Sequence, residues 1–442
     1  MDFLNGGQCD PRRFSEALKP STEYDALYNA ALCRERADWI VGINATRLFS
    51  CLYGQTLNVG RVMTPTLAMV VMRDAAIRAF KPEPFYSAEL KFRDFQAGGE
   101  RMKEKVEEEK LVAECCQAGS AIITKVERKE KSEKPPALFD LTSLQREANQ
   151  KYGYSAKQTL NIMQRLYENH KVLTYPRTDS RYIGKDIVPT IKERLKACAV
   201  GPYRKLAGAC GTGPYRKLAG VLISKPIQTN RSFVDDKKVS DHHAIIPTEQ
   251  FVQLDHMTNE ERKIYDMVVR RFLSVLYPPF VYEQVSMEGI VAGELFAASG
   301  KVVKSAGWKD VYENTDDTEE DEDTADDAQK LKDQKLPQMK KGERLHIENV
   351  SMNTGRTKPP ARFTEATLLA AMENPVRYME SHDTKAAKTL GETGGLGTVA
   401  TRADIIEKLF NSFLMEKKGN EIHLTSKAKQ LLELVPEELR KP

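Results

Sequence analysis

The sequence predicts a multidomain α+β protein in which helical and β-rich stretches alternate. Hydrophobic residues recur at helical spacing near both ends and in the middle of the chain, whereas the two stretches between them read as strands. Proline pairs at 135–136 and 359–360 mark breaks between stretches. A length of 442 residues leaves room for about three domains.

The first half of the chain begins with a helical stretch at 22–78, in which Pro65 follows the capping residue type Thr64. Strands are expected at 85–92 and 120–130, around a short helix at 104–116. Helical spacing returns from Leu141, and Ser155 stands three residues before Gln158 as in a capping box.

The second half repeats this alternation. A helix at 261–277 is stopped by two prolines, and strands are expected at 281–293, 294–303 and 342–353. Helices follow, with a hairpin at 413–425 typical of a winged helix. The nested order predicts discontinuous domains, divided as helical 1–80, β 81–133, helical 134–279, β 280–357 with an acidic loop at 313–335, and helical 358–442.

The charge of the chain is unevenly distributed. The segment 313–327, ENTDDTEEDEDTADD, holds ten carboxylates and no Lys or Arg. Because the whole chain carries +4, the remainder carries +14 once those ten charges are set aside. A basic body indicates a polyanion as partner, although a solvated basic surface would give the same balance.

The composition argues against several classes of protein. Seven cysteines include no CxxC, which argues against a zinc ribbon or a disulfide framework and favours the cytoplasm. We see neither a secretory signal nor an apolar run of membrane-spanning length, so no membrane partner is expected. The octapeptide GPYRKLAG occurs at 201–208 and 213–220, which indicates a local duplication in a surface loop.

The segment LTYPRTDSRYI at 173–183 is the first candidate site. Pro176 disfavours the α region for Tyr175, and in an extended segment Arg177 would share a face with Tyr175. A tyrosine that attacks phosphate needs a cation beside the charge that develops, and Arg binds phosphate in a fork. Thr178 and Ser180 are expected to donate to flanking DNA phosphates.

The segment SDHHAIIPT at 240–248 is the second candidate. His242 could bind a phosphate oxygen or move a proton, and His243 is the weaker choice. A Tyr-x-Arg pair and paired histidines also occur at purely structural positions, so their spacing alone does not identify an enzyme.

Six segments together resemble the motifs of type IA DNA topoisomerases, nearest to topoisomerase III, and they stand in the family's order from about Glu23 to the C-terminus. They are VGRVMTPTLAMVV, KPPALFDLTSLQREAN, LTYPRTDSRYI, SDHHAIIPT, TKPPARFTEATLLAAME and GGLGTVATRADIIEKLF. The resemblance implies a toroidal core in which an all-β arch joins helical, winged-helix-like domains.

The same resemblance implies roles for particular residues. Tyr175 would be the nucleophile that cleaves one strand and holds its 5′ phosphate, with Arg177 and His242 completing the catalytic set. Arg61, Gln145 and Thr401 match positions that line the single-strand groove or the rim of the active site.

One departure from the family concerns magnesium. Members carry an N-terminal Toprim domain whose acidic cluster binds Mg²⁺, and no such motif is seen here. Three hypotheses follow. The chain could be a topoisomerase fragment that needs a Toprim domain in trans, or a module that only binds single-stranded DNA. A tyrosine recombinase is the third, but Tyr175 precedes His242 and no His-x-x-Arg is present.

Overall fold

The computed structural model describes most of the chain, namely residues 20–199, 222, 227, 229–239, 241–312, 334–379, 384–392 and 394–441. The acidic segment 313–327 and both GPYRKLAG copies lie outside these residues. The chain forms two compact units, each built from separate stretches. The helical unit contains Met1–Ala79, Ala137–Phe272 and Pro360–Pro442, and the sheet unit contains Phe80–Pro136 and Leu273–Pro359. The finer five-part division stays a prediction.

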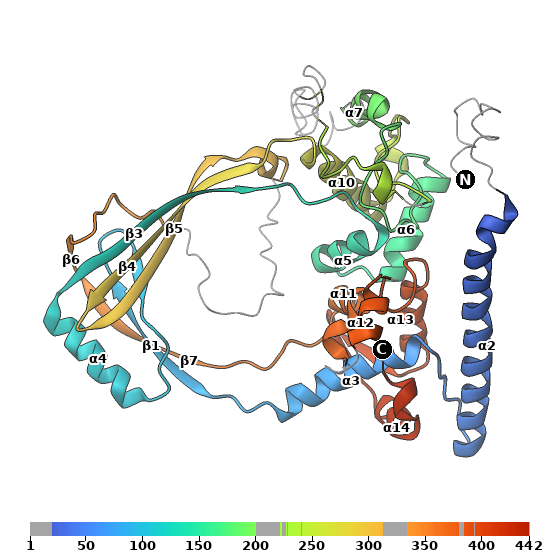
Figure 1. Ribbon diagram of the computed structural model, residues 1–442, viewed down its shortest axis with the longest axis horizontal. Coiled ribbons are helices and arrows are strands. Elements are labelled where there is room, and N and C mark those ends of the chain that lie inside the picture. The colour runs from blue at the N-terminus through green and yellow to red at the C-terminus, as the bar shows by residue number, and fades with distance from the viewer. Residues whose placement is uncertain are drawn as a thin grey trace. The chain divides into compact units, whose positions relative to one another are not determined.

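The sheet unit is built on a seven-stranded sheet whose strand order is β6-β3-β4-β5-β2-β1-β7 (Figure 1). All the pairings are antiparallel. The strands are β1 (Pro84–Lys91), β2 (Gln96–Gly98), β3 (Ser120–Glu133), β4 (Phe280–Val291), β5 (Glu294–Ser305), β6 (Arg344–His346) and β7 (Asn349–Arg356). Because β3 pairs with β4 along its length, the two stretches of this unit are joined through the middle of the sheet.

Helix α4 (Lys105–Ala118) packs on this sheet through its contacts with β1 and β7. Leu111 and Cys115 enter the apolar core that the strands supply. Burial raises the pKa of the Cys115 thiol to about 11, so this thiol stays protonated at neutral pH. Glu108 is also buried, and burial raises the pKa of its carboxyl group. A short 3₁₀ turn, η6 (Gly307–Val311), follows β5.

The helical unit contains ten α-helices among the described residues: α2 (Asp25–Tyr53), α3 (Met63–Ala79), α5 (Leu141–Tyr152), α6 (Ala156–Glu168), α7 (Ile191–Ala199), α10 (Asn259–Ser274), α11 (Glu365–Glu373), α12 (Thr384–Glu392), α13 (Arg402–Asn411) and α14 (Ser426–Leu434). Its 3₁₀ turns are η2 (Ser21–Tyr24), η3 (Val188–Thr190), η4 (Asp236–Lys238), η5 (Leu254–His256), η7 (Pro375–Tyr378) and η8 (Glu437–Leu439). The last residues of α10 belong to the sheet unit.

The predicted hairpin at 413–425 is confirmed. Strand β8 (Met415–Lys418) pairs antiparallel with β9 (Glu421–Leu424), directly after α13 and before α14. One core joins these elements to α3 and α11, and Leu67, Leu369 and Leu431 lie in it. The helical unit therefore closes its core between the first and the last stretch of the chain.

Capping explains where the helices near the candidate site begin. Ser155 caps α6 as predicted, because its hydroxyl accepts a hydrogen bond from the N–H of Gln158 at 3.0 Å. The reciprocal half of the predicted box is replaced, since the Gln158 side chain donates instead to Glu260 at 2.9 Å. Asp140 caps α5 in a reciprocal box with Ser143, which the sequence analysis did not identify.

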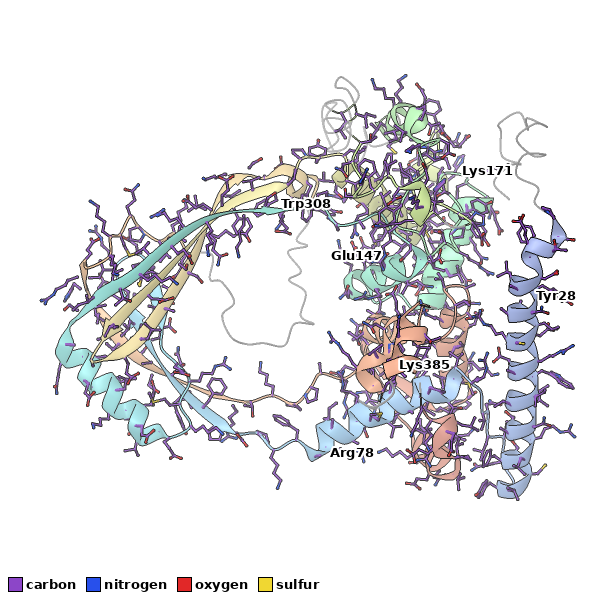
Figure 2. All side chains as sticks on the ribbon, viewed as in Figure 1. Tyr28, Arg78, Glu147, Lys171, Trp308 and Lys385 are labelled. Atoms are coloured by element: carbon purple, nitrogen blue, oxygen red, sulfur yellow. The ribbon has the colours of Figure 1, made fainter. Side chains whose placement is uncertain are left out.

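The long helix α2 is largely exposed, and Tyr28 projects from it (Figure 2). Phe49, near its C-terminal end, is the helix residue that joins the core. Among the described residues no helix is both long enough and apolar enough to cross a membrane.

Candidate active site around Tyr175

Two segments far apart in sequence lie side by side at the candidate site. The N–H of Thr174 donates to the carbonyl oxygen of Ile246 at 3.0 Å. The Thr174 hydroxyl donates to the carbonyl oxygen of Ala244 at 3.2 Å. These bonds fix the chain just before Tyr175 against the chain just after His242, so the two predicted candidates belong to one site.

The Tyr175 ring is held between two other rings. Its centroid lies 4.2 Å from that of His242, with the planes inclined by 33°. Tyr167 of α6 meets it edge-on, at 5.6 Å and 83°. Such contacts contribute about 0.5–1.5 kcal/mol each beyond the area they bury. The phenol is thus positioned by packing while remaining half-buried rather than enclosed.

The residues after Tyr175 alternate between solvent and interior. Arg177 and Asp179 are exposed, whereas Thr178 and Ser180 are buried. Exposed and buried side chains therefore alternate from Arg177 to Ser180, after a bend of the backbone at Pro176 and Arg177.

The two buried hydroxyls bind the backbone of neighbouring loops. Thr178 Oγ1 donates to the carbonyl oxygen of His242 at 3.0 Å, and Ser180 Oγ donates to that of Lys238 at 2.9 Å. From the sequence, both hydroxyls were expected to donate to DNA phosphates. Because their hydroxyls are engaged inside the protein, we assign them to holding the loop instead.

The two histidines differ in their surroundings. The His242 ring packs on Tyr175, whereas Nδ1 of His243 lies 2.7 Å from the carbonyl oxygen of Ala244. His242 is therefore the histidine whose ring lies against Tyr175.

Gln145 lies in the interior of the helical unit. Its Nε2 donates to the carbonyl oxygen of Ala156 at 2.9 Å, and the residue is fully buried. This bond ties α5 to the start of α6, so Gln145 supports the site rather than lining a groove.

Arg61 and Thr401 are exposed. Both lie near residues 394–397, whose sequence is GGLG and which are called the glycine loop below. A Cβ atom on Gly397 would stand 3.4 Å from Thr401 Oγ1 and 3.3 Å from Val62, the neighbour of Arg61. Gly397 has φ of +70°, a conformation that favours glycine. Arg61 Nε also donates to Asp38 at 2.8 Å.

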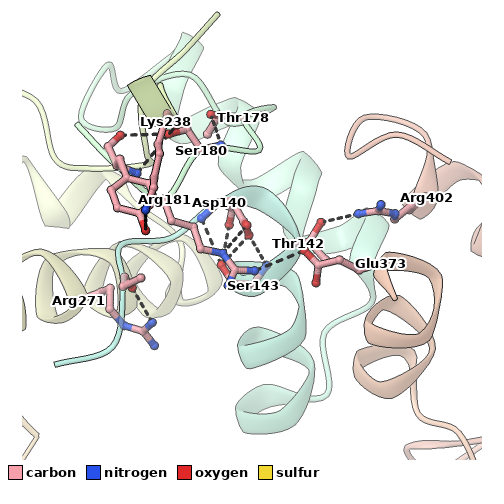
Figure 3. Close-up of polar contacts among 12 residues, drawn as sticks. Asp140, Thr142, Ser143, Thr178, Ser180, Arg181, Lys238, Arg271, Glu373 and Arg402 are labelled. Atoms are coloured by element: carbon pink, nitrogen blue, oxygen red, sulfur yellow. Dashed lines mark hydrogen bonds and ion pairs between the residues drawn. The ribbon is translucent and has the colours of Figure 1, made fainter. Parts of the chain in front are cut away.

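An ion-pair network lies beside residues 173–183, the loop that carries Tyr175 and is called the tyrosine loop below (Figure 3). This network was not predicted from the sequence. Arg181 Nε donates to Asp140 Oδ2 at 2.6 Å, and its Nη2 donates to Glu373 Oε1 at 3.4 Å. Burial alone would lower the pKa of Arg181, but the Asp140 and Glu373 carboxylates together with Tyr182 outweigh burial and raise it. The network thus joins the tyrosine loop to α5 and α11 through a fixed positive charge.

Arg402 forms a second buried contact nearby. Its guanidinium donates to Thr142 Oγ1 at 3.2 Å and to the carbonyl oxygen of Leu396 at 3.1 Å (Figure 3). Burial lowers the pKa of this guanidinium, which stays charged at neutral pH. Arg402 holds the glycine loop against α5.

The described residues contain no group of three or more His, Cys, Asp or Glu side chains placed to hold a metal ion. Two carboxylates beside the loop that carries Tyr175, those of Asp140 and Glu373, are bridged by Arg181 instead. These residues do not fit a magnesium centre, so we derive no step through a metal.

Comparison with known proteins agrees with this geometry. A family model described as DNA topoisomerase matches residues 22–442. This chain belongs to the DNA topoisomerase family. Two relatives confirm the type IA, topoisomerase III-like resemblance. DNA topoisomerase 3 of Bacillus thuringiensis (strain Al Hakam) is 52% identical over 431 residues, and that of Bacillus subtilis (strain 168) is 47% identical over 434 residues.

This topoisomerase chain spans little more than half the length of those curated relatives. The matches cover 96–97% of this chain but 57% of each relative. The full-length topoisomerase I of Thermotoga maritima superimposes with a TM-score of 0.61 at 22% identity, covering 90% of this chain and 58% of that one. At that identity the likeness shows the fold, and it confirms the predicted fold class.

Proposed function

We propose that this chain forms the strand-cleaving part of a type IA topoisomerase, with Tyr175 as nucleophile. The observation that carries the proposal is the packing of the Tyr175 ring on His242 at 4.2 Å, with the exposed Arg177 two residues further on. A phosphate bound over Tyr175 would meet a cation and an imidazole in the same place.

The proposed reaction exchanges one phosphodiester bond for another. The Tyr175 phenol oxygen forms a bond to phosphorus, and the bond from phosphorus to the 3′ oxygen of the neighbouring nucleotide breaks. The phenol proton is lost and the leaving oxygen gains one, so the chain ends are a 5′ phosphotyrosine and a 3′ hydroxyl. After another strand passes through the gap, attack by the 3′ hydroxyl restores the DNA and the phenol.

Two side chains support this exchange. Arg177 neutralises the charge that develops on the pentacovalent phosphate. His242 either holds a phosphate oxygen or carries the transferred proton. We further propose that magnesium is supplied by a separate acidic Toprim domain in trans, which would complete the site.

Covalent trapping tests the proposal. The chain is mixed with a separately produced Toprim polypeptide, magnesium and a single-stranded oligonucleotide labelled at its 3′ end. We expect the label to become attached to the chain and to map by mass spectrometry to the peptide that contains Tyr175. Transfer of a 5′ label, or attachment at another residue, would overturn the assignment.

A second function is favoured by the charge of the chain. The +14 body and the exposed side chains of Arg61 and Arg177 suit a module that grips single-stranded DNA without cutting it. Binding without turnover by the chain alone, at an affinity that falls steeply with salt, is the expected behaviour. Salt-independent affinity, or a preference for duplex, would contradict it.

Asp38 is expected to weaken this binding. Its carboxylate pairs with Arg61 while both side chains are about half-exposed, so it competes with a phosphate for the guanidinium. Asp38→Asn should tighten single-strand binding by about 2- to 5-fold at low salt. Arg61→Ala should make the slope of log affinity against log salt concentration shallower by about 0.7, because one phosphate contact is lost. Fluorescence anisotropy over a salt series measures both.

Glu109→Gln is the matched control, because it removes the same charge from an exposed ion pair in α4. An equal gain in affinity from Glu109→Gln would show that net charge, rather than the release of Arg61, is responsible.

We also propose a cytoplasmic location. The five cysteines among the described residues are free thiols, as expected in a reducing compartment.

A further inference from the structure

The loop that carries Tyr175 is fastened to the N-terminus of α5 at two points. The N–H of Leu141 donates to the carbonyl oxygen of Thr178 at 3.1 Å. Three residues further on, the Arg181 side chain reaches Asp140, the residue that caps the same helix. The loop therefore cannot slide along α5 without breaking both contacts.

The same loop is tied to the histidine. Thr178, whose carbonyl oxygen is held by α5, donates its hydroxyl to the carbonyl oxygen of His242. Tyr175 lies three residues before Thr178, so the distance between the phenol and the imidazole depends on where α5 holds this loop. A change at Asp140 or Arg181 would move the Tyr175 ring relative to His242.

We infer that Arg181 is a positioning residue for the nucleophile, an inference that rests on the proposed function of Tyr175. Its planar guanidinium bridges two carboxylates that come from different stretches of the chain, Asp140 before α5 and Glu373 at the end of α11. A lysine lacks this rigid planar fork, so its flexible ammonium group would hold the two carboxylates in a less defined geometry. The bridge fixes the register of the tyrosine loop against both helices.

The predicted consequence is a loss of rate without a loss of affinity. Arg181 is turned toward Asp140 and Glu373, so its replacement removes no proposed DNA contact. A displaced nucleophile slows the chemical step, and a misplacement of about 1 Å can lower the reaction rate by up to about 100-fold. Arg181→Gln should therefore lower the single-turnover rate of adduct formation by about 10- to 100-fold, with an unchanged half-saturating oligonucleotide concentration.

Asp140→Asn separates this role from helix capping. Asparagine caps helices as well as aspartate does, so α5 should be retained, but the ion pair with Arg181 is lost. The rate should fall as it does for Arg181→Gln, with some loss of thermal stability because the Asp140 carboxylate is buried, but with the chain still folded at the assay temperature. Arg181→Lys should recover part of the rate.

A second readout is independent of cleavage. Tyr175 lies close enough to His242 to shift its ring signals, which ¹³C-labelled histidine reports by NMR in the chain alone. The His242 signal is identified by its loss in His242→Gln. Arg181→Gln and Asp140→Asn should move it toward its position in Tyr175→Leu.

The outcomes distinguish this inference from the proposed function. An unmoved His242 signal overturns the inference, and so does a raised half-saturating concentration at an unchanged rate, which would make Arg181 a DNA contact. If the parent chain forms no adduct under any condition, the proposed function fails, and the NMR signal still decides whether Arg181 positions the tyrosine.

Discussion

Tyr175→Phe is expected to reduce the covalent protein–DNA adduct by at least about 1000-fold, because it removes the oxygen that is proposed to bond to phosphorus. The ring is retained, so its packing on His242 and Tyr167 should persist. Single-strand affinity should stay within about twofold, since affinity rests mainly on cations that the change leaves in place. Adduct formation is measured with the 3′-labelled oligonucleotide, and affinity by anisotropy.

Tyr167→Phe is the matched control for this experiment. Tyr167 meets the Tyr175 ring edge-on from α6, so the same hydroxyl is removed about one ring away from the proposed nucleophile. We expect this variant to keep forming the adduct. If Tyr167→Phe loses the adduct and Tyr175→Phe keeps it, the nucleophile is Tyr167 and the proposed reaction must be reassigned.

Asp74→Asn is expected to produce the largest loss of stability. Asp74 is buried in α3 and binds Arg362 at 2.9 Å, Arg78 at 3.0 Å and Lys429 of α14 at 3.3 Å. Asparagine would leave the half-buried cations of Arg362 and Lys429 without their shared carboxylate, which should cost about 1 to 3 kcal/mol. Chemical denaturation should show the transition of the helical unit at a lower midpoint.

The same carboxylate should make stability depend on pH. Burial alone would raise the pKa of Asp74, but its hydrogen bonds to Arg362 and Lys429 and the charge of Arg78 outweigh burial and lower it. A lowered pKa means that the stabilisation is present above the unfolded value of about 3.9 and is lost as pH falls through the folded value. In Asp74→Asn, the free energy of unfolding should therefore change less with pH in this acid range.

Glu437→Gln provides the control for acid sensitivity. The pKa of Glu437 is also lowered, by its bond to Lys441, but both side chains are exposed. Exposed pairs contribute little, so this variant should unfold like the parent chain. An equal effect at both positions would show that the acid sensitivity follows total charge and not the buried cluster at Asp74.

The elements were predictable from sequence where local rules govern them. Periodicity indicated the alternation of helical and β-rich stretches, and the cap at Ser155 followed from its side chain. Alternate residues of an extended segment share a face, and this rule predicted that Arg177 lies on the face of Tyr175. The same rule puts Thr178 and Ser180 on the opposite face, so it argues against the prediction that their hydroxyls donate to DNA phosphates. Asp140 followed by Ser143 was a readable N-cap signal.

The rest of the site depends on tertiary contacts that no local pattern reveals. Arg181 meets Glu373 across 192 residues of sequence, and Gln145 is buried because α6 folds back on α5. Glutamine is usually exposed, so the burial of Gln145 could not be predicted without its partner, and neither could the pairing of Arg181 with Glu373.

The discontinuous helical unit has a consequence for synthesis on the ribosome. Helix α3 packs against α13 and α14, which emerge about 350 residues later, some 20 to 70 s at about 5–20 residues per second. During that time the apolar face of α3 lacks most of its native core, because few residues of that core, such as Phe49 and Leu57, precede α3 in the chain. Nascent chains should therefore be most prone to aggregate, and most dependent on chaperones, until translation passes Leu434.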